Sequence, residues 1–242
     1  MRKFLIIALF LFIAGFAFAQ NQGQNEIGTP DAEQLGTDSA QRKIKEVSVD
    51  KFEHDGFWRS RMSSDEGYVT SRLFGGDLDN PAGPKGKKPI EEEADLGISD
   101  NYVMGTRVDF LRRGHNNFFI YPTRPIPIEG IAKYLTVWVA GRNFKHDLFL
   151  QIQDFFGKNY ELYVGKMNFM GWKQMTVVVP ESIVQRNYHY NNHMGIKVMG
   201  FRIECDPLES FGSYYLYFDD LRAVTDLFAE EERDEDDMAD GW

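Results

Sequence analysis

The chain has 242 residues, with 27 lysines and arginines against 37 aspartates and glutamates, so its net charge is −10 at neutral pH. No stretch concentrates positive charge, which argues against nucleic acid as a partner, and an anionic membrane surface would repel such an acidic chain. The single cysteine, Cys205, excludes an internal disulfide and a metal site built from several thiolates, so the core has to hold the fold together.

The first twenty residues, MRKFLIIALFLFIAGFAFAQ, have the organisation of a secretory signal peptide. Two basic residues precede an apolar run over residues 4–16, and Ala17-Phe18-Ala19 supplies the small residues of a cleavage site. We expect cleavage between Ala19 and Gln20. The apolar run is shorter than the roughly 20 residues of a membrane span, so we expect an exported mature chain with no membrane anchor. It keeps 25 basic and 37 acidic residues, a net charge of −12.

Residues 20–45 are rich in Gln, Asn, Gly and Thr, which indicates a flexible leader. From residue 46 to residue 226, short apolar stretches alternate with Gly, Pro, Asn and Asp, and we interpret this part as one domain. Its predicted strands are, in chain order, Val47–Glu53, Val103–Leu111, Asn117–Tyr121, Tyr134–Ala140, Asp147–Phe155, Tyr160–Lys166, Trp172–Val179, Lys197–Cys205 and Tyr214–Val224.

Alternation of apolar and polar residues supports several of these strands. Three sets of apolar residues each share one strand face: Leu135, Val137 and Val139; Leu148, Leu150 and Ile152; Phe201, Ile203 and Cys205. The stretch QDFFGKNYEL joins two strands through a Gly-Lys-Asn turn, as in a hairpin. Since no helical pattern separates the strands, we predict an all-β fold of antiparallel sheets, a β-sandwich or jelly roll. Cys205 is expected to be buried.

Three segments interrupt the regular spacing. Residues 75–100 contain three prolines and five glycines and are expected to form a long exposed loop. The stretch NYHYNNHM places His189 and His193 four residues apart, but its adjacent asparagines favour a polar loop over a metal site. Residues 227–242 carry a run of carboxylates that repel one another, which predicts a disordered acidic tail ending at Trp242.

The chain lacks the motifs of the common enzyme classes. It has no GxSxG, GxxxxGK[ST], GxGxxG, HExxH or CxxC, and no arrangement of nucleophile and base stands out, so we expect neither catalysis nor a cofactor. Aromatic residues make up 14% of the chain, and core packing is expected for Trp58, Trp138 and Trp172. The surplus of Tyr and Phe also suits apolar contact patches on the surface.

The last predicted strand carries two adjacent acidic residues, Asp219 and Asp220, in SYYLYFDDLRAV. Because alternate side chains of a strand point to opposite faces, these two carboxylates are not expected to share a catalytic cleft. We favour a position at the strand end, where carboxylates accept backbone N–H bonds. Calcium, which takes oxygen ligands, is the alternative.

Several stretches together resemble a known family. GFW at residues 56–58 follows Phe52-Glu53, IPIEGIAKYLTVWVAGRN leads to DLFLQIQDFFGKNYELYVGKMNFMGWKQMTVVVP, and YYLYFDDL closes the domain. The chain is similar over most of residues 45–225 to the spirochaete flagellar filament outer layer (sheath) proteins, FlaA. Its layout resembles, more loosely, the jelly-roll carbohydrate-binding (galactose-binding-like) modules, which often carry a calcium site.

The first resemblance implies a structural protein in the periplasm. It would coat the flagellin core of a periplasmic flagellum together with other sheath proteins, associate with itself along the filament, and affect filament stiffness, curvature and motility. The second implies a secreted carbohydrate-binding module. A sugar site should show exposed aromatic rings in one plane, whereas a sheath subunit should show apolar patches on more than one face.

Overall fold

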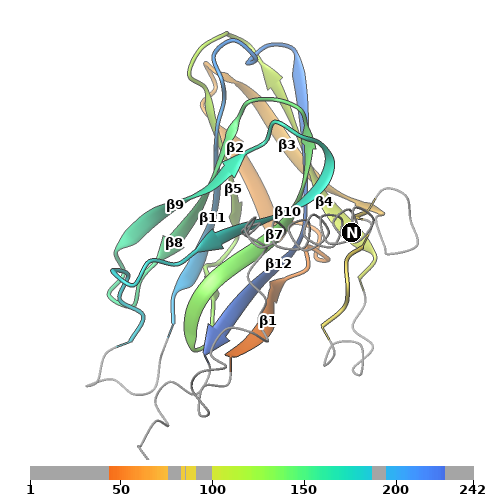
Figure 1. Cartoon of the computed structure of the whole chain (residues 1–242). Coiled ribbons are helices and arrows are strands. Elements are labelled where there is room, and N and C mark those ends of the chain that lie inside the picture. Colours follow the sequence, from red (N-terminus) through yellow and green to blue (C-terminus); the bar gives the residue numbers. More distant parts are fainter. Residues whose placement is uncertain (1–43, 76–82, 85, 91–99, 187–194, 227–242) are drawn as a thin grey trace, which may run out of the picture. The chain divides into compact units, whose positions relative to one another are not determined.

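The computed structural model describes residues 44–75, 83–84, 86–90, 100–186 and 195–226 (Figure 1). The chain divides into residues 1–35 and residues 36–242, and every described residue belongs to the second unit. The signal peptide, the leader up to residue 43, the stretch with His189 and His193, and the acidic tail lie outside the described residues. What the sequence suggests for them stays a prediction.

The described residues form twelve strands. They are β1 (Ile44–Asp50), β2 (Trp58–Met62), β3 (Gly67–Gly75), β4 (Tyr102–Phe110), β5 (Asn117–Pro122), β6 (Ile126–Pro127), β7 (Ile131–Arg142), β8 (Asp147–Gln153), β9 (Asn159–Lys166), β10 (Met170–Val178), β11 (Lys197–Glu204) and β12 (Ser213–Asp226). All nine predicted strands are present, with ends shifted by up to three residues. The strands β2, β3 and β6 were not predicted.

The strands form two sheets, and every pairing between them is antiparallel. Sheet A has the order β10-β7-β12-β4-β3, with β1 also on β12, and sheet B has the order β2-β5-β11-β8-β9, with β6 also on β11 (Figure 1). The prediction of an all-β antiparallel sandwich is therefore confirmed. No helix in the described part of the chain has the length and apolarity needed to cross a membrane.

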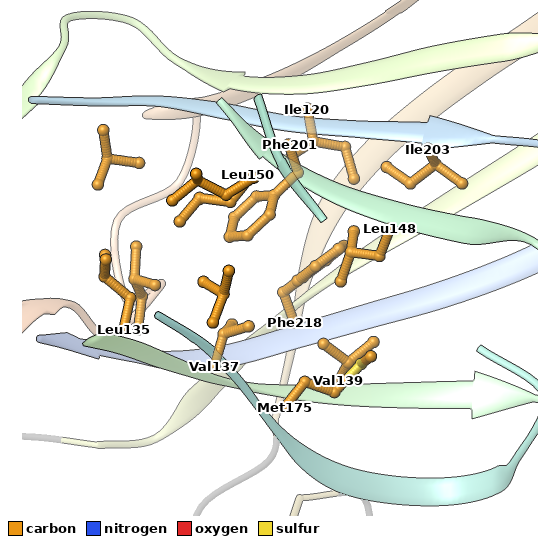
Figure 2. Close-up of a cluster of buried hydrophobic side chains, with 14 of the residues drawn as sticks. Ile120, Leu135, Val137, Val139, Leu148, Leu150, Met175, Phe201, Ile203 and Phe218 are labelled. Carbon is orange, nitrogen blue, oxygen red and sulfur yellow. The ribbon is translucent and has the colours of Figure 1, made fainter. Parts of the chain in front are cut away.

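One hydrophobic core fills the space between the two sheets. Figure 2 shows side chains of sheet A facing those of sheet B: Leu135, Val137, Val139, Met175 and Phe218 on one side, Ile120, Leu148, Leu150, Phe201 and Ile203 on the other. All ten are buried, so the predicted alternation is confirmed for these strands. Cys205 is buried beside them, also as predicted.

Aromatic rings join the sheets at the centre of this core. The rings of Phe201 and Phe218, one from each sheet, stack with centroids 4.8 Å apart. Phe52 lies between Phe218 and Trp58, at 6.2 Å and 4.8 Å. Such pairs add about 0.5–1.5 kcal/mol each beyond the area that they bury. Phe52 and Trp58 therefore close the core near β1, and the core position predicted for Trp58 is confirmed.

The core position expected for Trp138 and Trp172 is wrong. Trp138 on β7 and Trp172 on β10 are only half-buried, because both lie on the outer face of sheet A rather than in the core. The outer face is identified by register. Trp172 pairs with Ala140 and Ala140 pairs with Tyr217, and directly paired residues lie on the same face of a sheet. The next residue after Tyr217, Phe218, is buried in the core, so Tyr217, Ala140 and Trp172 lie on the face away from the core.

Candidate functional site

The two aspartates of β12 lie in a β-bulge. Opposite β7, Asp219 pairs with Trp138 and Arg222 with Thr136, so two residues of β12 face a single residue of β7. The φ angle of Asp220 is 50°, a left-handed conformation that aspartate tolerates better than most residues. On the other edge of β12, β4 pairs as far as residue 218 and β1 pairs from residue 221 onward. The bulge therefore lies where β12 exchanges one neighbour for another.

This geometry corrects two expectations for Asp219 and Asp220. They do not lie at a strand end, because β12 continues to Asp226. The two side chains were also expected on opposite faces of the strand. The bulge interrupts the alternation there, and both carboxylates join one ionic cluster. Both side chains are fully buried, and neither accepts a backbone N–H bond in the described part of the chain.

Basic side chains neutralise both carboxylates. The Lys87 ammonium donates to Asp219 Oδ2 at 2.8 Å and to Asp100 Oδ1 at 2.7 Å. The Arg222 guanidinium lies 2.6 Å from Asp220 Oδ2 and donates to the Lys88 carbonyl. We call Lys87, Asp100, Asp219, Asp220 and Arg222 the ionic cluster. It ties residues 87 and 88 to the outer face of sheet A.

The ionic cluster also shows that the segment 75–100, whose nature as a long loop stays a prediction, contains buried as well as exposed residues in its described part. Among the described residues of this segment, Gly83, Pro84 and Lys87 are buried, and only 3% of the Lys87 side chain is exposed. Sequence reasoning passed over Lys87 because nothing local distinguishes it from Lys85 and Lys88. Its buried partner, Asp219, lies 132 residues away in the sequence. The segment is therefore anchored by a buried charge at its middle.

Burial dominates the electrostatics of the ionic cluster. Desolvation raises the pKa of Asp219 to about 7, although the Lys87 ammonium opposes the shift. Asp219 and Asp100 in turn raise the pKa of Lys87 against the effect of its own burial, so the lysine stays charged. One oxygen of each carboxylate lies beside a basic group, the Lys87 ammonium or the Arg222 guanidinium, and calcium at this place stays a prediction. No three acidic, His or Cys side chains of the described chain gather as a metal site.

The outer face of sheet A carries a layer of aromatic and arginine side chains. One cross-strand row runs through Arg72, Gly105, Tyr217, Ala140 and Trp172. A side chain at position 105 would collide with the rings of Phe74 and Tyr217, so glycine lets these two rings meet edge to face at 5.6 Å. They border a depression of about 350 Å³.

Arginines stack on the rings of this face. The guanidinium of Arg72 lies 4.5 Å from the centre of the Phe74 ring, and that of Arg142 lies 5.5 Å from the Tyr217 ring. Four large apolar residues of the same face are exposed: Tyr68 by 64%, Met170 by 73%, Val178 by 62% and Tyr215 by 40%. We call this layer the sheet A surface. Its composition, aromatic with Arg and Met, is that of protein interfaces.

The outer face of sheet B carries a second, more polar layer. A cross-strand row of Arg61, Phe119, Arg202, Phe149 and Tyr163 alternates charged and aromatic side chains. The Arg202 guanidinium lies 4.1 Å from the centre of the Phe149 ring and donates to Glu161 and Glu204. Its charge is thus neutralised within the face. Beside this row lies a cleft of about 510 Å³.

Several solved structures with a similar arrangement of strands are carbohydrate-binding modules. The family 11 module from Clostridium thermocellum, in complex with a β-1,3-1,4-mixed-linked tetrasaccharide, matches 76% of this chain and 98% of its own, with 12% identity and a TM-score of 0.44. TmCBM61, in complex with β-1,4-galactotriose, matches 72% and 96%, with 14% identity and a TM-score of 0.38. At these values the likeness concerns the fold alone.

Two curated relatives are flagellar proteins. One, described as "Putative flagellar filament outer layer-like protein" of Brachyspira hyodysenteriae (strain ATCC 49526 / WA1), is 35% identical over 224 residues, which cover 92% of this chain and 94% of the relative. The flagellar filament outer layer protein of Spirochaeta aurantia is 27% identical over 173 residues, 57% of this chain and 51% of that protein. The family model described as "Flagellar filament outer layer protein Flaa" matches residues 19–233. The resemblance found in the sequence is thereby confirmed, and the chain belongs to the flagellar filament outer layer protein family, FlaA.

Proposed function

We propose that this protein is a subunit of the outer layer of a periplasmic flagellar filament and that it binds the flagellin core through the sheet A surface. There it would add to the stiffness and curvature of the filament and so to cell motility. The observation that carries the proposal is the layer of exposed aromatic and arginine side chains on sheet A, in a chain that belongs to the outer layer family.

The physics of this surface suits lasting contact with a protein. Aromatic and arginine residues dominate binding energy at interfaces, because they bury much area, and an aromatic ring also loses little side-chain freedom. The arginines stacked on Phe74 and Tyr217 are already held in place, which lowers the entropy lost on binding. A sandwich joined by one rigid core would then act as a stiff plate on the filament.

Exposed apolar residues at the two ends of the sandwich support association between neighbouring copies. Glu204 pairs with Asp147 and Lys197 with Gln153, so the residues after β11 and those after β8 lie at opposite strand ends. Leu208 and Phe211 are exposed at the first end, and Phe156 is exposed at the other. Contact between unlike ends generates an open chain of subunits, as along a filament.

A secretory signal peptide is removed from the mature protein after export. We expect the mature protein to begin at Gln20, because Ala17 and Ala19 satisfy the small-residue rule around Phe18. N-terminal sequencing and the intact mass of protein isolated with the filaments measure this directly. A mature protein that retains residues 1–19 would contradict the prediction.

The sheet A surface is tested by co-sedimentation with filaments stripped of their outer layer. Tyr215→Asp places a charge on the apolar surface at an exposed position, so it should spare the fold but weaken filament binding by about thirtyfold or more, the range of an interface hot spot. The matched control is Tyr163→Asp, an exposed tyrosine on the outer face of sheet B. Unfolding midpoints of both variants verify that the fold is intact.

Equal binding by the two variants and the original protein would remove the sheet A surface from the filament contact. If instead only Tyr163→Asp lost binding, the filament contact would lie on sheet B. Because the two substitutions are chemically identical, a difference between them reports the face and not the added charge.

A further inference from the structure

The cleft on the outer face of sheet B is formed by a β-bulge in β11. Opposite β8, Met199 is an extra residue between Val198 and Gly200, and its side chain lines the cleft. Gly200 has a φ angle of 137°, and a side chain there would collide with the Ile120 carbonyl of β5. Bulges of this kind redirect a side chain, and the glycine marks a close backbone approach. The cleft is therefore built into the strands themselves.

The cleft combines aromatic and other apolar residues with a polar wall. Its apolar residues are Phe119, Tyr121, Tyr160, Met199 and the two prolines at 122 and 125, and its polar residues are Arg61, Gln151, Asn159 and Glu161. The rings of Phe119 and Tyr121 are half-buried on the outer face, so each keeps part of its surface open. Tyr160 contributes from the edge strand β9, where it packs against the core and donates to Asp154. A volume of about 510 Å³ falls within the range of ligand sites, roughly 300–1,000 Å³.

The polar wall is ordered by its own hydrogen bonds. Glu161 Oε1 accepts from Gln151 Nε2 at 2.9 Å and from Arg202 Nε at 3.0 Å. Partial burial raises the pKa of Glu161, but the bonds from Arg202 and Gln151 outweigh it, so the pKa falls and the carboxylate stays ionised as an acceptor. Arg61 lies above the rings of Phe119 and Tyr121, at 4.9 Å and 5.6 Å, and brings donors to the rim.

We propose that this cleft binds a pyranose oligosaccharide. A pyranose ring has one face of C–H groups, which suits the part of the Phe119 and Tyr121 surface that Arg61 leaves open, and an edge of hydroxyls that donate and accept, which suits the Gln, Asn, Glu and Arg side chains of the wall. An extended peptide would need unpaired backbone groups at a sheet edge. The cleft instead runs across the face of sheet B from β2 over β5, β11 and β8 to β9, and its lining residues are side chains of that face rather than one free strand edge. The proposal does not rest on the filament contact of sheet A.

Glycan strands of a cell wall and glycans attached to filament proteins share this chemistry. Isothermal titration calorimetry of the purified protein with two probes separates them: N-acetylhexosamine oligosaccharides released from purified cell wall, and oligosaccharides released chemically from isolated filaments. We expect at least one probe to bind with a Kd of about 1 mM or tighter. The probe that binds identifies the source.

Variants then place the binding in the cleft. Tyr121→Ala and Glu161→Gln should each weaken binding by about tenfold or more, since each removes a group that faces the sugar. Glu161 is exposed, so Glu161→Gln leaves the fold intact even if Tyr121→Ala does not. Tyr102→Ala, at an exposed tyrosine outside the cleft lining, is the matched control and should bind like the original protein.

Three results would overturn the proposal. The first is that neither oligosaccharide probe produces heat of binding with the original protein. The second is that Glu161→Gln and Tyr102→Ala bind equally well. The third is that filament peptides stripped of glycan bind while the released oligosaccharides do not, in which case the occupant of the cleft is a peptide.

Discussion

Replacing Lys87 with alanine is expected to destabilise the protein by about 3–5 kcal/mol, the range measured when one partner of a buried ion pair is removed. The Lys87 ammonium is the described group that donates to Asp219, which is fully buried. Without it, the carboxylate would have to be protonated or remain charged without a partner, and both cost free energy. Urea unfolding at pH 7.5 measures the loss, and its midpoint should fall with little change in slope.

Lys88→Ala is the matched control for this substitution. Lys88 is the neighbouring lysine, its side chain is exposed, and only its backbone carbonyl accepts a bond from Arg222. We expect it to change stability by no more than about 0.5 kcal/mol. The double variant Lys87→Met with Asp219→Asn removes both charges and should recover at least half of the loss. A Lys87→Ala variant as stable as Lys88→Ala would contradict the ion pair.

The same measurements test calcium. Because an ammonium faces Asp219 and a guanidinium faces Asp220, calcium and a chelator should both leave the unfolding midpoint unchanged. A chelator that lowers the midpoint of the original protein but not that of Asp219→Asn would restore the calcium interpretation made from the sequence.

Much of the fold followed from the sequence because alternation is a local property. The strands that face the core, such as β7, β8 and β11, repeat apolar residues every second position and were predicted. The strands β2 and β3 were not. In WRSRM of β2, Arg59 and Arg61 point outward and only Trp58 is buried, so the apolar signal is too short to distinguish a strand from a loop. In GYVTSRLFG of β3, an edge strand, only the first residue is fully buried.

The ionic cluster and the cleft could not be predicted, because both depend on bulges. A bulge shifts the alternation by one residue, and nothing in YFDDL or VMGFR fixes where this occurs. The sequence signals that remain are indirect: two adjacent acids within an apolar strand, and a glycine at position 200 within another. Each of these two signals lies at a bulge. The partners, Lys87 for the acids and β5 for the glycine, come from elsewhere in the chain.

The raised pKa of Asp219 gives the fold a pH dependence that Asp219→Asn should abolish. In the folded protein this pKa is about 7, above the value of about 3.8 that an exposed aspartate has. Between these values the folded state holds a proton that the unfolded chain has released. The contribution of Asp219 to stability is therefore present at low pH and is lost as the pH rises through 7.

The effect is measured as the difference between the original protein and Asp219→Asn in urea unfolding at pH 5.5 and pH 7.5. From 5.5 to 7.5, the original protein should lose about 2 kcal/mol relative to the variant. His146 titrates in the opposite sense, since burial lowers its pKa to about 4, so stability gained from it rises with pH. Both proteins carry His146, and the subtraction cancels it. Stability curves that run parallel across this range would mean that Asp219 keeps an ordinary pKa, with Lys87 compensating its burial in full.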